Sequence, residues 1–156
     1  MIERLGGALD RLVLAILSAG FAALIVTVGL QVLARNVLKI PLIWTLDVAQ
    51  LLFTWLIFVG AAVAFRRGAH YFIDLVPDDR PRVSRALDFV SDAAALVIVV
   101  VLLRYGIMLT GMRSTGVIAS LGISEAWSYA AIPTGAALIG LFLLEKVARD
   151  LTKGRR

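Results

Sequence analysis

The side chains that could carry out chemistry are few in this chain, and their spacing forms no catalytic set. The 156-residue sequence contains a single histidine, His70, and no cysteine, so a His/Cys metal cluster and a thiolate nucleophile are both excluded. Its glycines form neither a phosphate-binding loop nor a dinucleotide-binding fingerprint. Serines are present, but His70 and the Ser-rich segment lie at opposite ends of the apolar runs, which separates the members of a Ser/His site. The sequence therefore predicts that the protein is not an enzyme.

The carboxylates are poorly placed for binding a coupling ion. A transporter that couples an ion to its solute usually has a carboxylate or an unwound helix near the middle of the bilayer. No such carboxylate lies inside an apolar run of this chain, which argues against one alternative function, a small autonomous four-helix exporter. A second alternative, a membrane assembly or regulatory protein without a transport role, needs no such group. The acids that border apolar runs all lie at the ends of those runs, and they are Asp47, Asp88, Asp92, Glu125 and Glu145.

Arg104 is the one charge well inside an apolar run. It lies about eight residues, or ~12 Å, from the outer end of its expected helix. One interpretation is that its long stem carries the guanidinium to the outer interface. The other is that Arg104 is an anchor that pairs with an acid such as Asp47, or with a lipid phosphate. Because a central Arg costs at least ~2.5 kcal/mol on insertion scales and tends to be partnered, we favour the second and expect Arg104→Leu to weaken assembly.

The composition is that of an integral membrane protein. Hydrophobic residues make up 60% of the chain and charged residues 17%, and the mean hydropathy is +0.91, which is too apolar for a soluble fold. The 16 Lys and Arg against 11 Asp and Glu give a net charge of +5. These basic residues cluster at the ends of apolar runs, so they indicate membrane orientation and not nucleic-acid binding.

Four apolar runs are long enough to cross a ~30 Å hydrocarbon core as helices. We therefore predict an all-α integral membrane protein with one four-helix domain over residues 1–156. The expected helices cover residues 12–34, 47–65, 84–112 and 126–147. The expected connections are a short interfacial helix at 1–11, a cytoplasmic hairpin loop at 66–83, an outer loop at 111–125 and a basic cytoplasmic tail at 148–156.

The basic residues also predict the orientation of the chain. With four crossings, one side of the membrane holds Arg4, Arg11, Arg66, Arg67, Arg80, Arg82, Arg85, Lys146, Arg149, Lys153, Arg155 and Arg156. The opposite side holds only Arg35, Lys39 and Arg113. Because basic residues concentrate on the cytoplasmic side, we predict that both termini are cytoplasmic. Trp44, Trp127 and Tyr129 then lie at the outer interface, as expected of an aromatic belt.

Helical spacing predicts which faces of the first two spans contact protein. Asp47, Gln50 and Thr54 share one side of the second span, which favours contact with protein, although Gln50 and Thr54 could simply bond neighbouring carbonyl groups. The bulky side chains lie elsewhere and are expected to face lipid; they are Phe53, Leu56 and Val63. On the first span, a stripe of small residues predicts close approach by another helix; it consists of Ala15, Ala19 and Ala23.

Four further residues could have a functional role, but each also has a simpler interpretation. Trp44 suits an interfacial belt, and Arg66 together with Arg67 suits a marker of the inner face. His70 has a side-chain type that could sense pH, yet a single loop histidine is more often incidental.

In order along the chain, four groups of residues resemble one known family. They are Arg35-Asn36 with Pro41-x-x-Trp44-Thr45-x-Asp47; Trp55-Leu56-x-Phe58-x-Gly60-Ala61-Ala62; Arg66-Arg67-Gly68-x-His70-x-x-x-Asp74; and Leu121-Gly122-Ile123 leading to Trp127, Tyr129 and Pro133. Over nearly its whole length the chain resembles the small membrane subunit of tripartite ATP-independent periplasmic (TRAP) transporters, the DctQ-like proteins. The family usually has two acids after the Trp-Ser/Thr pair, whereas here Leu46 replaces the first and leaves Asp47 alone.

The resemblance implies partners and a role. Such a subunit, in the inner membrane of a bacterium or archaeon, accompanies a large DctM-like membrane subunit that carries the substrate and sodium sites. A periplasmic DctP-like binding protein delivers an organic acid, either a carboxylate or a sulfonate. The small subunit would act as a scaffold in contact with membrane lipids, and would itself bind no cofactor.

The resemblance and the reasoning from residues together give the expected sites, with no catalytic or metal residues among them. By matching positions, Arg35, Trp44 and Asp47 would lie at the outer face. The inner hairpin would be shaped by Arg66, Gly68, His70 and Asp74. The remaining expected interface or structural residues are Gln50, Arg104 and Trp127.

Overall fold

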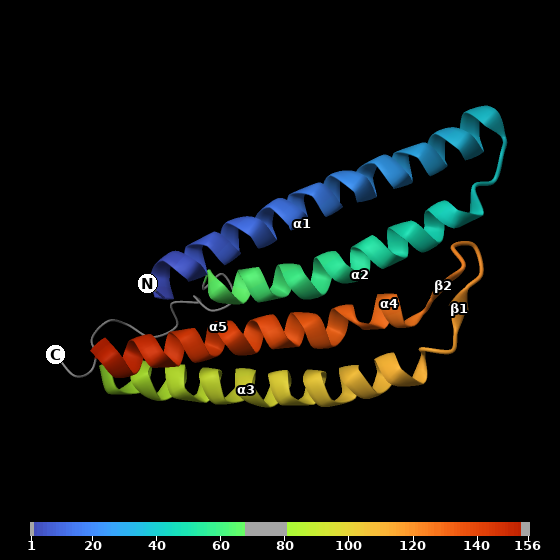
Figure 1. Ribbon diagram of the computed structural model, residues 1–156. Coiled ribbons are helices and arrows are strands. Elements are labelled where there is room, and N and C mark those ends of the chain that lie inside the picture. Colours follow the sequence, from blue (N-terminus) through green and yellow to red (C-terminus); the bar gives the residue numbers. More distant parts are fainter. Residues whose placement is uncertain (1, 68–80, 154–156) are drawn as a thin grey trace.

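Four long helices make up most of the protein. The computed structural model describes residues 2–67 and 81–153, and Figure 1 shows their arrangement. The long helices are α1 (Ile2–Leu33), α2 (Ile43–Arg66), α3 (Pro81–Met112) and α5 (Ala131–Lys153), and the single-turn helix α4 (Ala126–Tyr129) precedes α5. Each of four segments, at 11–38, 43–66, 90–112 and 126–148, is long and apolar enough to cross a membrane. The predicted all-α membrane fold with four spans is confirmed.

The elements differ in several details from those expected. Residues 2–11, expected as a separate interfacial helix, continue directly into α1. After Leu33 the chain forms a π-helical turn, η1 (Ala34–Leu38), in which the Ala34 carbonyl accepts the N–H of Lys39 and, at 3.1 Å, that of Ile40. The expected helix 126–147 is interrupted after Tyr129. The interruption follows from Pro133, which has no N–H to donate to the carbonyl four residues earlier.

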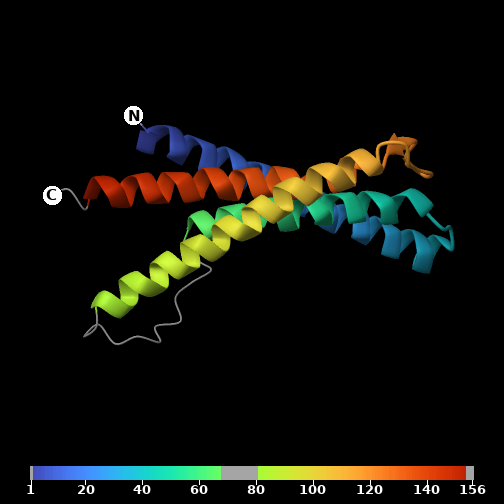
Figure 2. The same cartoon turned by 90° about the horizontal axis from the view of Figure 1, so that it is seen from below.

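The helices form a twisted raft with the order α1–α2–α5–α3. In Figure 1, α1 packs on α2, α2 on α5, and α5 on α3. Figure 2 shows that the helices cross instead of running strictly parallel, so the raft is twisted. The described chain therefore has two open edges, α1 and α3, and its last helix lies in the interior of the raft.

The side of α1 that faces α2 has buried or closely packed residues spaced seven apart, and the series continues to the first residue of η1. Val13, Thr27 and Ala34 are buried, and a Cβ added at Gly20 would lie 3.3 Å from Leu56 Cδ2. The predicted small-residue stripe at positions 15, 19 and 23 is exposed instead, so no helix of the described chain approaches it. The expected lipid-facing side of α2 was also partly wrong. Leu56 packs on α1 and Val63 is buried, whereas Phe53 is exposed as expected.

Small residues bring α5 close to both of its neighbours. A Cβ added at Gly135 would lie 2.6 Å from the carbonyl oxygen of Phe58 on α2. On the other side, a Cβ at Gly106 of α3 would lie 3.0 Å from Pro133 Cδ. Because apolar lipid does not drive membrane helices together, such close backbone approach supplies much of the attraction between them.

The raft has two distinct ends. α1 begins and α5 ends at the same end, which we call the terminal end (Figure 1). The opposite end holds the turn between α1 and α2 and the β-strands, and we call it the hairpin end (Figure 1). The assignment of the terminal end to the cytoplasm stays a prediction from the distribution of basic residues.

Candidate functional site

A small β-hairpin projects between α3 and α4 at the hairpin end. Strand β1 (Val117–Ile118) pairs antiparallel with β2 (Ile123–Ser124), with Val117 opposite Ser124 and Ile118 opposite Ile123. The turn is closed by the Ile118 carbonyl, which accepts the Gly122 N–H at 2.9 Å. Gly122 has a φ of +66°, a left-handed conformation that glycine adopts without a Cβ clash. The expected outer loop at 111–125 thus has a defined structure.

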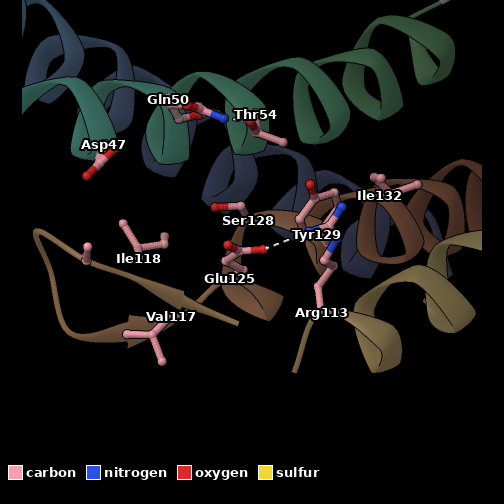
Figure 3. Close-up of a pocket in the computed structure, with 11 residues that line it drawn as sticks. Asp47, Gln50, Thr54, Arg113, Val117, Ile118, Glu125, Ser128, Tyr129 and Ile132 are labelled. Atoms are coloured by element: carbon pink, nitrogen blue, oxygen red, sulfur yellow. Dashed lines mark hydrogen bonds and ion pairs between the residues drawn. The ribbon is translucent and has the colours of Figure 1, made fainter. Parts of the chain in front are cut away.

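This hairpin, α2 and α4 enclose a pocket of about 520 Å³ (Figure 3). Asp47, Gln50 and Thr54 line it from α2, so these three residues lie on the face of α2 that turns toward the hairpin. Residues of the hairpin and of α4 line the opposite side, among them Ile118 and Ser128. The pocket therefore combines carboxylate, amide and hydroxyl groups with apolar walls.

Asp47 fastens the hairpin to α2. The Ser120 hydroxyl, in the hairpin turn, donates a hydrogen bond to Asp47 Oδ2. Figure 3 shows the Asp47 side chain pointing from α2 toward the hairpin. A hydrogen bond to a carboxylate is stronger than one between neutral groups, so this single contact ties the tip of the hairpin to the start of α2.

The base of the hairpin is held by a second polar group. Arg113, which follows α3, lies 3.4 Å from Glu125 Oε2, and its guanidinium lies 5.6 Å from the centre of the Tyr129 ring. The Glu125 N–H donates to the Gly116 carbonyl at 2.9 Å, and a Cβ at Gly116 would collide with the Glu125 side chain. These contacts join the end of α3 to the start of α4 across the hairpin.

A pair of tryptophans links α2 to α4. Trp55 Nε1 donates to the carbonyl oxygen of Trp127 at 2.9 Å. Trp55 lies about 18 Å along α2 from its start, where an indole N–H without an acceptor would be costly in a membrane. Nearby, the Thr54 hydroxyl donates to the Gln50 carbonyl at 2.8 Å, so Thr54 does bond its own helix as the plainer interpretation held.

At the terminal end, ion pairs join three helices. Arg66 of α2 lies 3.6 Å from Glu145 of α5, and both side chains are mostly buried. The Arg66 guanidinium also lies 5.0 Å from the centre of the Phe142 ring. Next to this pair, Lys146 Nζ lies 2.5 Å from Asp92 Oδ1 of α3. Arg66 is therefore part of the packing between helices as well as a basic residue at the end of a span.

The other expected site residues fall into separate regions. Arg35 lies in η1 with an exposed side chain, and Trp44 and Trp127 are 41% and 60% exposed at the hairpin end. Gly68, His70 and Asp74 lie outside the described residues.

The suggested pairing of Arg104 with Asp47 is not present. Asp47 accepts from Ser120, and among the described residues no ion pair involves Arg104. Arg104 lies on α3 with its side chain exposed. The structure thus leaves the deep positive charge on the surface of the described chain.

Four contacts were not predicted from the sequence, namely Ser120 with Asp47, Arg113 with Glu125, Trp55 with Trp127, and Arg66 with Glu145. Ser120 gave no signal, because one serine in a Gly/Ser-rich loop is not distinguished from its neighbours. The opposite charges Arg113 and Glu125 bracket that loop and could have predicted its closure. The position of Trp55 within an apolar run could have indicated that its N–H needs an acceptor. Glu145 could have been paired with Arg66, because both lie at the ends of apolar runs that are expected on the same side of the membrane.

Comparisons with known proteins agree with the geometry. The family of tripartite ATP-independent periplasmic transporters, DctQ component, matches residues 24–153. The sialic acid TRAP transporter small permease protein SiaQ of Vibrio cholerae is 29% identical over 127 residues, which are 81% of this chain and 73% of that protein.

A second relative is much longer than this chain. The sialic acid TRAP transporter permease protein SiaT of Haemophilus influenzae is 33% identical over 110 residues, which are 70% of this chain but only 18% of that protein. The chain therefore spans less than a fifth of this relative. The family match covers most of the chain, and four of its segments are long and apolar enough to cross a membrane. The chain therefore belongs to the DctQ component family of TRAP transporters and is a multi-pass protein of the inner membrane.

Proposed function

We propose that this chain is the small permease subunit of a sodium-coupled TRAP transporter and acts as a scaffold for a large transport subunit. The observation that carries the proposal is the match to 18% of the Haemophilus influenzae permease. A sequence that occurs as a segment of a longer permease is expected to work beside the remainder of that permease. For this chain, the counterpart of that remainder would be a separate DctM-like subunit.

The placement of charge supports a role in scaffolding. Solute and sodium sites in transporters need polar groups near the bilayer midplane, and no acid of this chain lies inside an apolar run. Its polar side chains instead join helices at the two ends of the raft, as in the Arg66–Glu145 and Asp47–Ser120 contacts. We therefore assign sodium and solute binding to the large subunit, and no cofactor to this chain.

The solute is proposed to be an organic acid, a carboxylate or sulfonate, delivered by a DctP-like periplasmic binding protein. Both relatives are named as sialic acid transporters, so a sialic acid is the first solute to test. The hairpin end, with its exposed Trp44 and Trp127, would face the periplasm under the predicted orientation and is available to that binding protein.

The test is reconstitution. The chain is co-purified in mild detergent with the large subunit and placed in liposomes, and uptake is measured with the binding protein and an inward sodium gradient. We expect uptake only when both membrane subunits are present, and none from this chain alone. Asp47→Asn is expected to change the rate without changing the preference between two carboxylate solutes.

Each alternative predicts a different result. Uptake by this chain alone would identify an autonomous transporter and would contradict the proposal. Binding of the large subunit without any effect of this chain on uptake would identify an assembly or regulatory protein, and would also contradict it.

A further inference from the structure

Arg104 lies on a face of α3 that no helix of the described chain covers. α3 packs on α5 through Ala95, Val99 and Gly106, which are buried. Because successive residues of an α-helix are rotated by about 100° around its axis, Arg104 lies on the side of α3 opposite to these buried residues. α3 is also an edge of the raft, so no described helix lies beyond this side (Figure 1). We call it the Arg104 face; it consists of the exposed residues Val90, Ala93, Val97, Val101, Arg104 and Met108.

The depth of Arg104 makes lipid exposure unfavourable. Within the span at 90–112, Arg104 lies about 5 Å from the midpoint and ~12 Å from the hairpin end. The nearer membrane surface is thus at the C-terminal end of α3. In an α-helix, however, each Cα–Cβ bond tilts toward the N-terminus. The stem of Arg104 therefore leaves the helix in the direction away from the nearer surface, which opposes snorkelling.

The described chain does not provide an anion for Arg104. Among the described residues no carboxylate is within ion-pair distance of it, and Asp47 is engaged by Ser120. A second copy of this chain would not provide one either, because its acids lie at the ends of the apolar runs. A lipid phosphate lies at the membrane surface, beyond the depth of this residue. An acid at mid-depth must come from a different membrane protein.

We propose that the Arg104 face is the surface on which the large membrane subunit docks, through a transmembrane helix with an Asp or Glu opposite Arg104. The inference rests on the proposed function, which supplies that subunit as the partner. Charge distinguishes this edge of the raft from the other. The outer side of α1 also exposes large apolar residues such as Ile25 and Val26, but no charge lies between positions 12 and 34, so lipid can cover that side.

The first experiment measures assembly. The chain is tagged and co-expressed with the large subunit, and the amount of large subunit retained in mild detergent is compared among variants. Arg104→Leu is expected to weaken association roughly three- to eighteenfold, the range of interhelical polar contacts in membranes. Arg104→Lys keeps the charge and should lose less. The matched control is Lys39→Asn, which removes an exposed charge outside the spans and should have no effect.

The second experiment locates the interface, and it exploits the absence of cysteine. Single cysteines at Val97, Val101 and Met108 carry a photoactivatable maleimide in native membranes, and Ile25→Cys on α1 serves as the control. We expect crosslinks to the large subunit from α3 and none from Ile25. Val101→Cys in an otherwise unchanged chain also tests docking if Arg104→Leu fails to insert.

The outcomes separate this inference from the proposed function. If the unchanged chain co-purifies with the large subunit but only the cysteine at Ile25 crosslinks to that subunit, the inference is overturned and the scaffold role stays intact. If the Arg104→Leu variant retains the large subunit fully and the cysteines of the Arg104 face crosslink only to lipid, a lipid phosphate is the partner of Arg104. That result would also overturn the inference. Failure of the unchanged chain to retain the large subunit at all would instead contradict the proposed function.

Discussion

Asp47 shows what a single carboxylate does at the edge of this membrane domain. The resemblance to the DctQ-like proteins led to an expectation of two neighbouring acids, and Leu46 replaces one of them. The remaining acid accepts the hydroxyl of Ser120 and thereby ties the hairpin to α2. Only one carboxylate is needed for this contact. The position of Asp47 at the start of a span was predictable from sequence, whereas its partner was not.

The role of this contact can be tested by hairpin mobility. A spin label is attached at Ala119→Cys, in the hairpin turn of the otherwise cysteine-free chain, and its spectrum is recorded in detergent. Asp47→Ala is expected to raise the population of detached hairpin by roughly tenfold or more, because hydrogen bonds to charged groups contribute ~1.5–3 kcal/mol. Ser120→Ala should give the same change.

Gln50→Ala is the matched control, since Gln50 also lines the pocket but has no side-chain bond to the hairpin in the described structure. Equal mobility in the Asp47→Ala variant and the unchanged chain would show that other contacts hold the hairpin.

At the scale of elements, the raft depends on how closely α5 approaches its neighbours. Gly135 places the backbone of α5 against the Phe58 carbonyl of α2. A backbone group cannot rotate out of the way as a flexible side chain can. The small residues of α5 therefore set the distance between the two central helices.

We predict that Gly135→Ala lowers the unfolding temperature in detergent. The added methyl would lie 2.6 Å from the Phe58 oxygen, and overpacking of this kind costs about 1–3 kcal/mol. Gly60→Ala on α2 is the control, because a Cβ there meets nothing within 4 Å. It should be neutral or stabilise by up to ~1 kcal/mol through helix propensity. An equal response of both variants would mean that propensity and not packing dominates.

The spans could be predicted from sequence because their signals are local. An uncharged run such as 48–65 identifies a crossing whatever it packs against. Which faces meet is decided between distant segments, and there the predictions failed. The alanine stripe at positions 15, 19 and 23 looked suited to close packing, yet α1 uses Gly20 and Thr27. Likewise, no local pattern in a loop rich in Gly and Ser distinguishes Ser120 as the partner of Asp47.

For the molecule as a whole, the orientation in the membrane stays a prediction that labelling can test. Single cysteines at Ser114, at the hairpin end, and at Thr152, at the terminal end, are treated in intact cells with a membrane-impermeant maleimide. We expect labelling of Ser114→Cys only, because the basic residues place the terminal end in the cytoplasm. Thr152→Cys should react after permeabilisation, which serves as its control. Labelling of Thr152→Cys in intact cells would reverse the orientation.

The order of helices in the raft has a consequence for biosynthesis. α5 lies between α2 and α3 although it is made last of the four. α3 therefore has no main packing partner among the described helices made before it, and it must wait for α5. At ~5–20 residues per second, the residues after Met112 take several seconds to synthesise. During that interval α1 and α2 can already be paired, while α3, with its arginine, is a solitary helix that the insertion machinery or another membrane protein has to shelter.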